Sequence, residues 1–229
     1  MMEAEGKRKT PGKPQETGNG PWKGRRMAEM VNVAVDAMGG DNAPGETVKG
    51  AAEAVNADKR IKVFLVGREP AIREELKKYN FDPERLEVVH AEEVIETGEP
   101  PVMAIRKKKD SSLVKCMNMV KAGECDALVS AGSTGAVLGG GQVIIGRIKG
   151  VERPPLAPII PNVKGVSLLL DCGANVDARS SHLVQFAKMG SIYMEHVLGV
   201  KNPKVGIVNI GAEEEKGNAL VKETFPLLK

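Results

Sequence analysis

Short apolar segments alternate with longer segments of mixed polarity from Val31 to the end of the chain. Strands are predicted for the apolar segments at 31–36, 61–66, 86–90, 127–130, 166–171 and 204–209. Helices are predicted at 46–56, 69–79, from Pro101 onward, and at 113–121, 135–148, 180–198 and 218–228. Strands that alternate with helices in this way specify a mostly parallel sheet with helices on both faces. We therefore expect a three-layer α/β/α fold.

The two ends of the chain differ from this pattern. Residues 1–29 are rich in Gly, Pro, Lys and Glu and would bury too little apolar surface to fold alone. They predict a disordered N-terminal extension, and Met30 is an alternative start. Residues 30–229 are expected to form one α/β domain. The last residues, Phe225–Lys229, leave an apolar helical face uncovered, which suggests a domain that lacks its C-terminal part.

The segment DALVSAGSTGAVL (126–138) combines a predicted strand, a turn of small residues and the start of a helix. Gly132 and Gly135 permit backbone angles that let successive N–H groups point at one spot. Ser133 and Thr134 add hydroxyl donors, and a helix N-terminus favours an anion. The alternative is an ordinary strand-to-helix turn that Ser or Thr caps. Both interpretations predict a helix that begins close to Gly135.

Four predicted strands end in loops that are rich in Gly, Asp and Asn, at 36–41, 130–135, 171–177 and 209–218. Ligands of parallel sheets bind at the carboxyl ends of the strands, so we expect these loops to converge on one rim. Glycine amides, hydroxyls and a lysine together suit an oxyanion such as phosphate. The nucleotide signatures GxxxxGK[ST] and GxGxxG after a strand do not occur. Gly139–Gly141 lie inside a predicted helix, where close helix packing is expected.

Composition and charge argue against several classes of function. Seven Lys and Arg and four Glu lie in residues 1–30, so the whole formal net charge of +3 is located there and the rest is neutral. With only 3% aromatic residues, the chain offers neither a basic face nor a stacking surface for nucleic acid. The three cysteines form no CxxC pair, so we expect buried thiols in a reducing compartment rather than disulfides or zinc. A cytoplasmic protein is predicted.

Outside the glycine-rich loops, few side chains suggest a catalytic, metal-binding or docking role. Lys216 lies in EEEKGN (213–218), where it either belongs to a solvated charge run or directs a cation at phosphate or a developing oxyanion. The histidines show no metal spacing, and a structural or surface role is favoured for His182. Strand-end aspartates more often cap helices than bind metal, so no metal is expected. The basic run at 106–109 is a solvated helix end or a docking site for an acidic partner.

Seven segments in order resemble the phosphate acyltransferase family of bacterial phospholipid synthesis. They are AVDAMGGDNAP (34–44), HAEEVIETGEPP (90–101), RKKKDSS (106–112), SAGSTGA (130–136), GRIKGVERP (146–154), LLLDCGANVDA (168–178) and NIGAEEEKGN (209–218). The resemblance covers Met30 to Lys229. The leader before Met30 departs from the pattern, and the family's C-terminal portion, with a further Asp-Gly-Phe-x-Gly-Asn loop, is missing.

The resemblance implies an enzyme that makes acyl phosphate from acyl-acyl carrier protein and inorganic phosphate. It also implies a fold similar to the isocitrate and isopropylmalate dehydrogenases and to phosphotransacetylase. It further implies a cytoplasmic homodimer that associates loosely with the inner face of the membrane, and a product that passes to a membrane-bound glycerol-3-phosphate acyltransferase. Neither a metal, a nicotinamide nor another cofactor is implied.

The loops and the resemblance together give a hypothesis for the site. Phosphate is held by the first two glycine-rich loops, through Asp36, Gly39, Gly40, Asp41, Gly132, Ser133, Thr134 and Gly135. Lys216 and Asn209 are the expected catalytic residues. The site is lined by Asp171, Asn175 and Asn218. The carrier protein docks on Arg106, Lys107, Lys108 and Lys109.

Three alternatives remain at this point. A phosphotransacetylase-like enzyme would use coenzyme A thioesters as the acyl donor. A decarboxylating dehydrogenase on the same fold would need nicotinamide and usually a divalent metal. A non-catalytic regulator would bind phosphate or an acyl group without consuming the thioester. Fold alone does not separate these functions.

Overall fold

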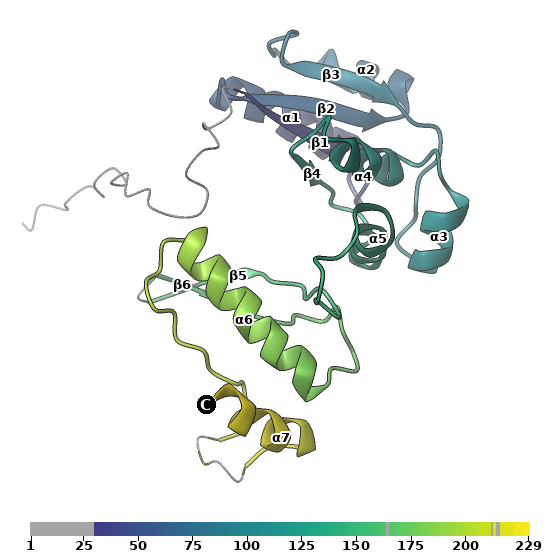
Figure 1. Ribbon diagram of the computed structural model, residues 1–229. Helices are drawn as coiled ribbons and strands as arrows, with labels where there is room; N and C mark the ends of the chain where they lie inside the picture. The colour runs from purple at the N-terminus through teal and green to yellow at the C-terminus, as the bar shows by residue number, and fades with distance from the viewer. Residues whose placement is uncertain (1–29, 164, 212, 214–215) are drawn as a thin grey trace, which may run out of the picture.

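A four-stranded parallel sheet organises the first half of the chain. Its strands are β1 (Val31–Asp36), β2 (Ile61–Gly67), β3 (Leu86–His90) and β4 (Ala127–Val129). They lie in the order β3-β2-β1-β4 (Figure 1). The computed structural model describes residues 30–163, 165–211, 213 and 216–229. Because β1 pairs with β4 in parallel, the loops that follow these two strands leave the same edge of the sheet side by side.

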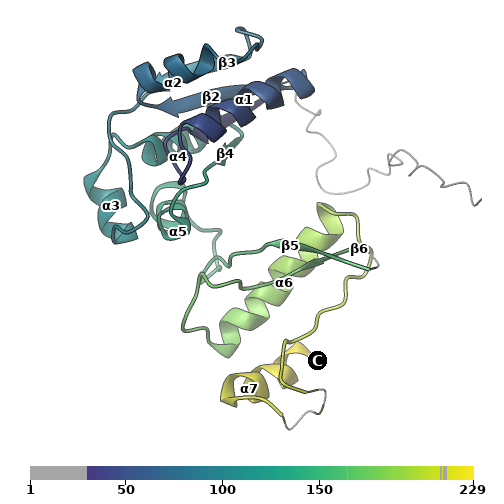
Figure 2. The ribbon, with the colours of Figure 1, turned by 180° about the vertical axis from the view of Figure 1, so that it is seen from behind.

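Helices cover both faces of this sheet. Helices α1 (Gly45–Ala57) and α2 (Glu69–Leu76) lie on one face, and α4 (Ser112–Ala122) lies on the other (Figures 1 and 2). Leu65 of β2 packs with α1 and α2, whereas its neighbour Val66 packs with Cys116 of α4. This alternation follows from the two-residue period of a strand, and it buries both faces.

Further helices pack beside α4. Helix α3 (Pro101–Lys107) packs against α5 (Thr134–Gly140), which continues into the single-turn π-helix η1 (Gly141–Ile145). A Cβ atom on Gly140 would lie 2.3 Å from Sδ of Met117, so α5 approaches α4 more closely than any side chain would allow. This confirms the expected packing role for Gly140. At Gly141 the space for a Cβ is open.

The second half of the chain has a different architecture. Strands β5 (Ile159–Asn162) and β6 (Gly165–Leu168) form an antiparallel pair, followed by α6 (Ser180–His196) and α7 (Ala219–Leu228). A Cβ on Gly190 would lie 2.4 Å from Leu170, so the chain after β6 packs closely on α6. Helix α7 packs on α6 as well, and Ser180 Oγ donates to Glu223 at 2.7 Å.

The α/β fold with its mostly parallel sheet is confirmed, but two predicted strands are not in that sheet. Of the segment predicted at 166–171, only residues up to Leu168 form a strand, β6, which pairs only with β5 among the described residues. Residues 204–209 carry no strand. Strand β5 was not predicted, because it contains Pro161; a proline removes one ladder donor and is tolerated at the edge of a sheet. Among the described helices, none is long and apolar enough to cross a membrane. The expected disordered extension at 1–29 lies outside the described residues.

Candidate functional site

Asp36 joins the loops that follow β1 and β4. Its side chain is almost fully buried at the end of β1. Ser130 Oγ donates to Asp36 Oδ2 at 2.7 Å and accepts from the backbone N–H of Gly132 at 3.1 Å. The other carboxylate oxygen accepts from the N–H of Met38 at 3.3 Å. One carboxylate therefore fixes both loops, which we call the glycine junction (residues 36–41 and 130–135).

The backbones of the two loops nearly touch. A Cβ on Gly39 would lie 2.4 Å from Asp36 Oδ2 and 2.9 Å from Ser130 Oγ, which leaves room only for glycine. A Cβ on Gly132 would lie 3.3 Å from the Cα of Gly39. Gly40 has a φ of +107°, a conformation that residues with side chains rarely adopt. The predicted convergence of these two loops is thus present in the structure.

Helix α5 begins at the glycine junction. Ser133 is the N-cap, and its Oγ accepts from the N–H of Ala136 at 3.3 Å. Its hydroxyl is therefore used by the helix, as the alternative interpretation expected. Thr134 and Gly135 are exposed in the first turn, where free N–H groups favour an anion. Asp41, the last residue of the first loop, is exposed too.

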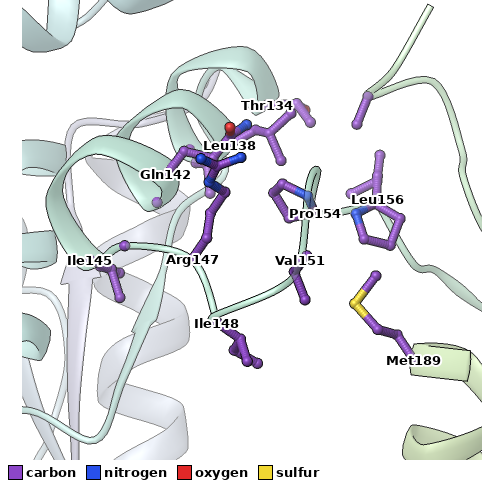
Figure 3. A pocket seen from close by; sticks show the side chains of 15 residues that line it. Thr134, Leu138, Gln142, Ile145, Arg147, Ile148, Val151, Pro154, Leu156 and Met189 are labelled. Atoms are coloured by element: carbon purple, nitrogen blue, oxygen red, sulfur yellow. The ribbon is translucent and has the colours of Figure 1, made fainter. Parts of the chain in front are cut away.

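A pocket of about 450 Å³ begins at Thr134 and extends along α5 and η1 (Figure 3). Its opposite wall is the segment 147–156, which we call the strap. Beyond the strap, the pocket reaches Ala174, in the loop after β6, and Met189 of α6. Most of the lining is aliphatic, and it comprises Thr134, Val137, Leu138, Gly141, Gln142, Ile145, Gly146, Arg147, Ile148, Val151, Pro154, Pro155, Leu156, Ala174 and Met189. This pocket was not predicted from the sequence.

The third predicted loop supports the pocket wall. Asp171 accepts from the N–H of Leu156 and from the N–H of Asn175, both at 2.6 Å. The amide of Asn175 donates to the carbonyl of Pro154 at 3.1 Å. Asp171 and Asn175 thus hold the strap in place, while Ala174 between them lines the pocket.

Helix α6 holds the strap from the other side. His182 is buried, and its Nε2 lies 3.0 Å from Oε2 of Glu152. Because Nδ1 accepts from the N–H of Arg179, the neutral ring carries its proton on Nε2 and donates it to Glu152. Gln185 accepts from the N–H of Glu152 at 2.9 Å. The structural role expected for His182 is confirmed.

The fourth predicted loop stands apart from the glycine junction. Lys216 Nζ pairs with Glu213 at 2.8 Å, and Asn209 donates to the carbonyl of Lys216 at 2.9 Å. Asn218 caps α7 by accepting from the N–H of Val221 at 3.0 Å. In both views β5, β6 and α6 lie between α5 and α7 (Figures 1 and 2). The expected convergence of four loops is therefore wrong for this one, because 204–209 does not join the parallel sheet.

The four cations of the basic run at the end of α3 differ in their contacts. Arg106, Lys107 and Lys109 are exposed. Lys108 instead donates to Glu99 at 2.5 Å and to the carbonyl of Val94 at 2.6 Å. The hydrogen bond from Lys108 lowers the pKa of Glu99. Lys108 thus holds its own loop, and three exposed cations remain for a partner.

The cysteines only partly follow the expectation of buried thiols. Cys116 and Cys125 are buried, and burial raises the pKa of both thiols, with a further contribution at Cys116 from the charge of Asp36. Cys116 is therefore a protonated packing residue beside the junction. Cys172 is exposed, contrary to the prediction. In the described part of the chain, no three His, Cys, Asp or Glu side chains are grouped so as to hold a metal ion.

Comparison with known proteins places the chain in a sequence family. The model of the family described as "Fatty acid synthesis protein" matches residues 31–229. A phosphate acyltransferase of Clostridium beijerinckii is 55% identical over 199 residues, which are 87% of this chain and 60% of that protein. A phosphate acyltransferase of Clostridium perfringens is 53% identical over 87% of this chain and 59% of its own length. The chain thus spans about 60% of the length of these curated relatives.

Solved structures show the same fold at low sequence identity. The EutD phosphotransacetylase from Staphylococcus aureus matches with a TM-score of 0.61 and 21% identity, over 88% of this chain and 64% of that one. A phosphotransacetylase from Streptococcus pyogenes matches with a TM-score of 0.59 and 17% identity, over 87% and 65%. These similarities support the predicted three-layer architecture.

Proposed function

This chain belongs to the fatty acid synthesis protein family, and from that premise we propose that it forms an acyl phosphate from an acyl thioester and inorganic phosphate. The acyl donor is acyl-acyl carrier protein, and the product feeds phospholipid synthesis. One observation carries the proposal: the anion-favouring start of α5 opens directly into an apolar pocket through Thr134. The names of the curated relatives point to the same reaction.

The chemistry needs mainly positioning. One oxygen of phosphate, held by the glycine junction, attacks the thioester carbonyl carbon. The new C–O bond gives a tetrahedral oxyanion, the C–S bond breaks as this intermediate collapses to acyl phosphate, and the leaving thiolate takes a proton from solvent. Phosphate is already anionic at neutral pH, so orientation supplies much of the rate. Backbone N–H groups of the first turn of α5 bind the phosphate charge. No metal or organic cofactor enters this scheme.

Lys216 and Asn209 are proposed to stabilise the tetrahedral oxyanion. Lys216 is held by one exposed ion pair to Glu213, with about half of each side chain accessible. Exposed pairs of this kind contribute little, so the lysine can exchange its partner for a substrate charge at small cost. Asn218 caps α7 and keeps the loop attached to that helix. The role of Lys216 requires that the 209–218 loop approach Thr134 during turnover.

The surroundings of the site suit a protein-bound acyl donor. Helix α3 packs on α5, so the exposed Arg106, Lys107 and Lys109 lie at the C-terminal end of the helix that is next to α5. An acidic carrier protein would meet these cations, and salt would weaken its docking. From the family resemblance we further propose a cytoplasmic homodimer at the inner face of the membrane. Its product would pass to a membrane-bound glycerol-3-phosphate acyltransferase.

The test is a comparison of two acyl donors. The purified chain is incubated with phosphate and either acyl-acyl carrier protein or acyl-coenzyme A, and acyl phosphate is trapped with hydroxylamine. We expect phosphate-dependent loss of the carrier-protein thioester. Activity with coenzyme A alone would favour the phosphotransacetylase-like alternative. Phosphate binding without loss of thioester would favour a regulator, and nicotinamide reduction would favour a dehydrogenase.

A further inference from the structure

The pocket beside α5 is larger than phosphate chemistry requires. Phosphate and a thioester carbonyl need only the glycine junction, yet the pocket extends from Thr134 to Met189 (Figure 3). Its volume of about 450 Å³ lies within the range of about 300–1,000 Å³ that is usual for small-molecule sites. The space is therefore adequate for a ligand that continues beyond the reacting carbon.

The lining changes from polar to apolar along the pocket. Thr134 lies at one end, and Met189 points from α6 toward the strap at the other end (Figure 3). Gln142 and Arg147 add polar groups close to Thr134 and Leu138 (Figure 3). The rest of the wall is mostly aliphatic, with Val137 and Leu138 on α5, Ile145 on η1, and Ile148, Val151 and Leu156 on the strap. A matching ligand has a reactive head and a hydrocarbon body.

The strap wall is held in place by contacts to α6 and to the loop after β6. The buried ring of His182 and the amide of Gln185 bind Glu152, and Asp171 binds the N–H of Leu156. These contacts fix the middle and the end of the strap from two different elements, α6 and the loop after β6. A preformed pocket lowers the ordering cost of binding a flexible chain.

We propose that this pocket binds the hydrocarbon chain of the acyl donor, with the reacting carbonyl at Thr134 and the terminal methyl toward Met189. The inference rests on the proposed acyl transfer and adds to it a chain-binding subsite. In this arrangement Met189, the lining residue on α6, would limit the length of chain that fits. Unbranched chains follow the path between α5 and the strap.

A direct binding experiment tests the pocket without turnover. The fluorescent linear fatty acid cis-parinaric acid is titrated into the purified chain with neither phosphate nor carrier protein. Met189→Glu places a charge in the apolar pocket and should lower the affinity at least about tenfold. Met194→Glu is the matched control, because it makes the same change on α6 away from the pocket lining, and it should change the affinity less than about twofold. Circular dichroism verifies that both variants fold.

Changes in size at the same position test the proposed end of the pocket. Competition with saturated fatty acids of increasing length gives the preferred length for each variant. Met189→Trp should shift the preference to shorter chains, and Met189→Ala should shift it to longer chains. An unchanged preference in both variants would overturn the assignment of Met189 as the end of the pocket.

The outcomes separate the pocket from the reaction. Binding that Met189→Glu abolishes and Met194→Glu preserves supports the pocket, even if no acyl phosphate forms and the proposed function fails. Acyl phosphate formation with fatty acid binding that is equal in both variants overturns the pocket and leaves the function standing. Absence of binding in the folded unmodified chain also overturns the pocket.

Discussion

The two halves of the described chain use apolar side chains in opposite ways. In the parallel sheet, Val63, Leu65 and Val66 are buried between helices on both faces. In the second half, Val163 is fully exposed, and Val208 and Ile210 are exposed by 82% and 87%. Apolar runs of similar composition thus give a packed sheet in one half and an open surface in the other. The difference shows that a strand pattern becomes a strand only where a partner strand and a covering helix are available.

The largest expected contrast is in stability. Leu65→Ala removes a fully buried side chain of the first half and should lower the free energy of unfolding by about 2–5 kcal/mol. Val208→Ala removes an exposed side chain of the second half and should change it by less than about 0.5 kcal/mol. Urea titrations followed by circular dichroism measure both values. Equal losses would show that 204–209 is packed in solution and would remove the contrast.

The second contrast concerns the proposed catalytic role of the second half of the chain. Lys216→Ala should lower turnover about 100-fold if its ammonium group stabilises the oxyanion, as for other donors of this kind. Lys222→Ala, on α7, is the matched control and should leave turnover unchanged. The rate of acyl phosphate formation is the measurement. Near-normal turnover in Lys216→Ala would confine the chemistry to the glycine junction.

A third contrast compares one glycine from each half. Gly39→Ala would place a methyl group 2.4 Å from Asp36 Oδ2, so the junction must open. Displacement of a site by about 1 Å can cost up to about 100-fold in rate, and we expect at least about a tenfold loss of phosphate affinity. Gly206→Ala meets open space and should have no effect on phosphate binding. Isothermal titration with inorganic phosphate measures both, and an unaffected Gly39→Ala would show that the junction is not the phosphate site.

The smallest contrast is in the response to acid. The hydrogen bond from Arg60 lowers the pKa of Asp58 in the first half to about 2, from 3.8. A lowered folded-state pKa contributes stability above pH 3.8, which is lost as the pH falls toward 2. The pair is exposed, so the effect should be small. Unfolding midpoints between pH 5 and pH 2 should decline less steeply in Asp58→Asn; an identical decline would show that the pair does not contribute.

Much of the first half was predictable from the sequence because its signals are local. The apolar runs of β1, β2 and β3 and the turn GST before α5 each lie within a few residues. The junction was also predictable, since parallel strands place their end loops at one edge and only glycine fits at Gly39. Strand β5 was not, because Pro161 argues against a strand until its antiparallel partner is known.

The pocket and the place of Lys216 could not be predicted for a different reason. Ile148 and Met189 face one cavity only because the strap between them is shaped by two hydrogen bonds, one that His182 donates to Glu152 and one that Asp171 accepts from Leu156. The pattern of apolar and polar residues in the sequence does not predict those hydrogen bonds. The place of Lys216 was predicted from a strand at 204–209 that does not form. The remaining signal for the pocket, a row of exposed apolar residues on η1 and the strap, becomes informative only with the fold.

The hydrogen bond between Ser130 and Asp36 also determines the order in which the site can be assembled. It joins residues separated by 94 positions in sequence. Closing a loop of this length slows folding more than local pairing does. During synthesis on the ribosome, β1, β2 and β3 emerge before β4, so a nascent chain holds most of its sheet while it still lacks an anion site. The glycine junction, our proposed phosphate site, is therefore completed in one step, when β4 pairs with the edge strand β1.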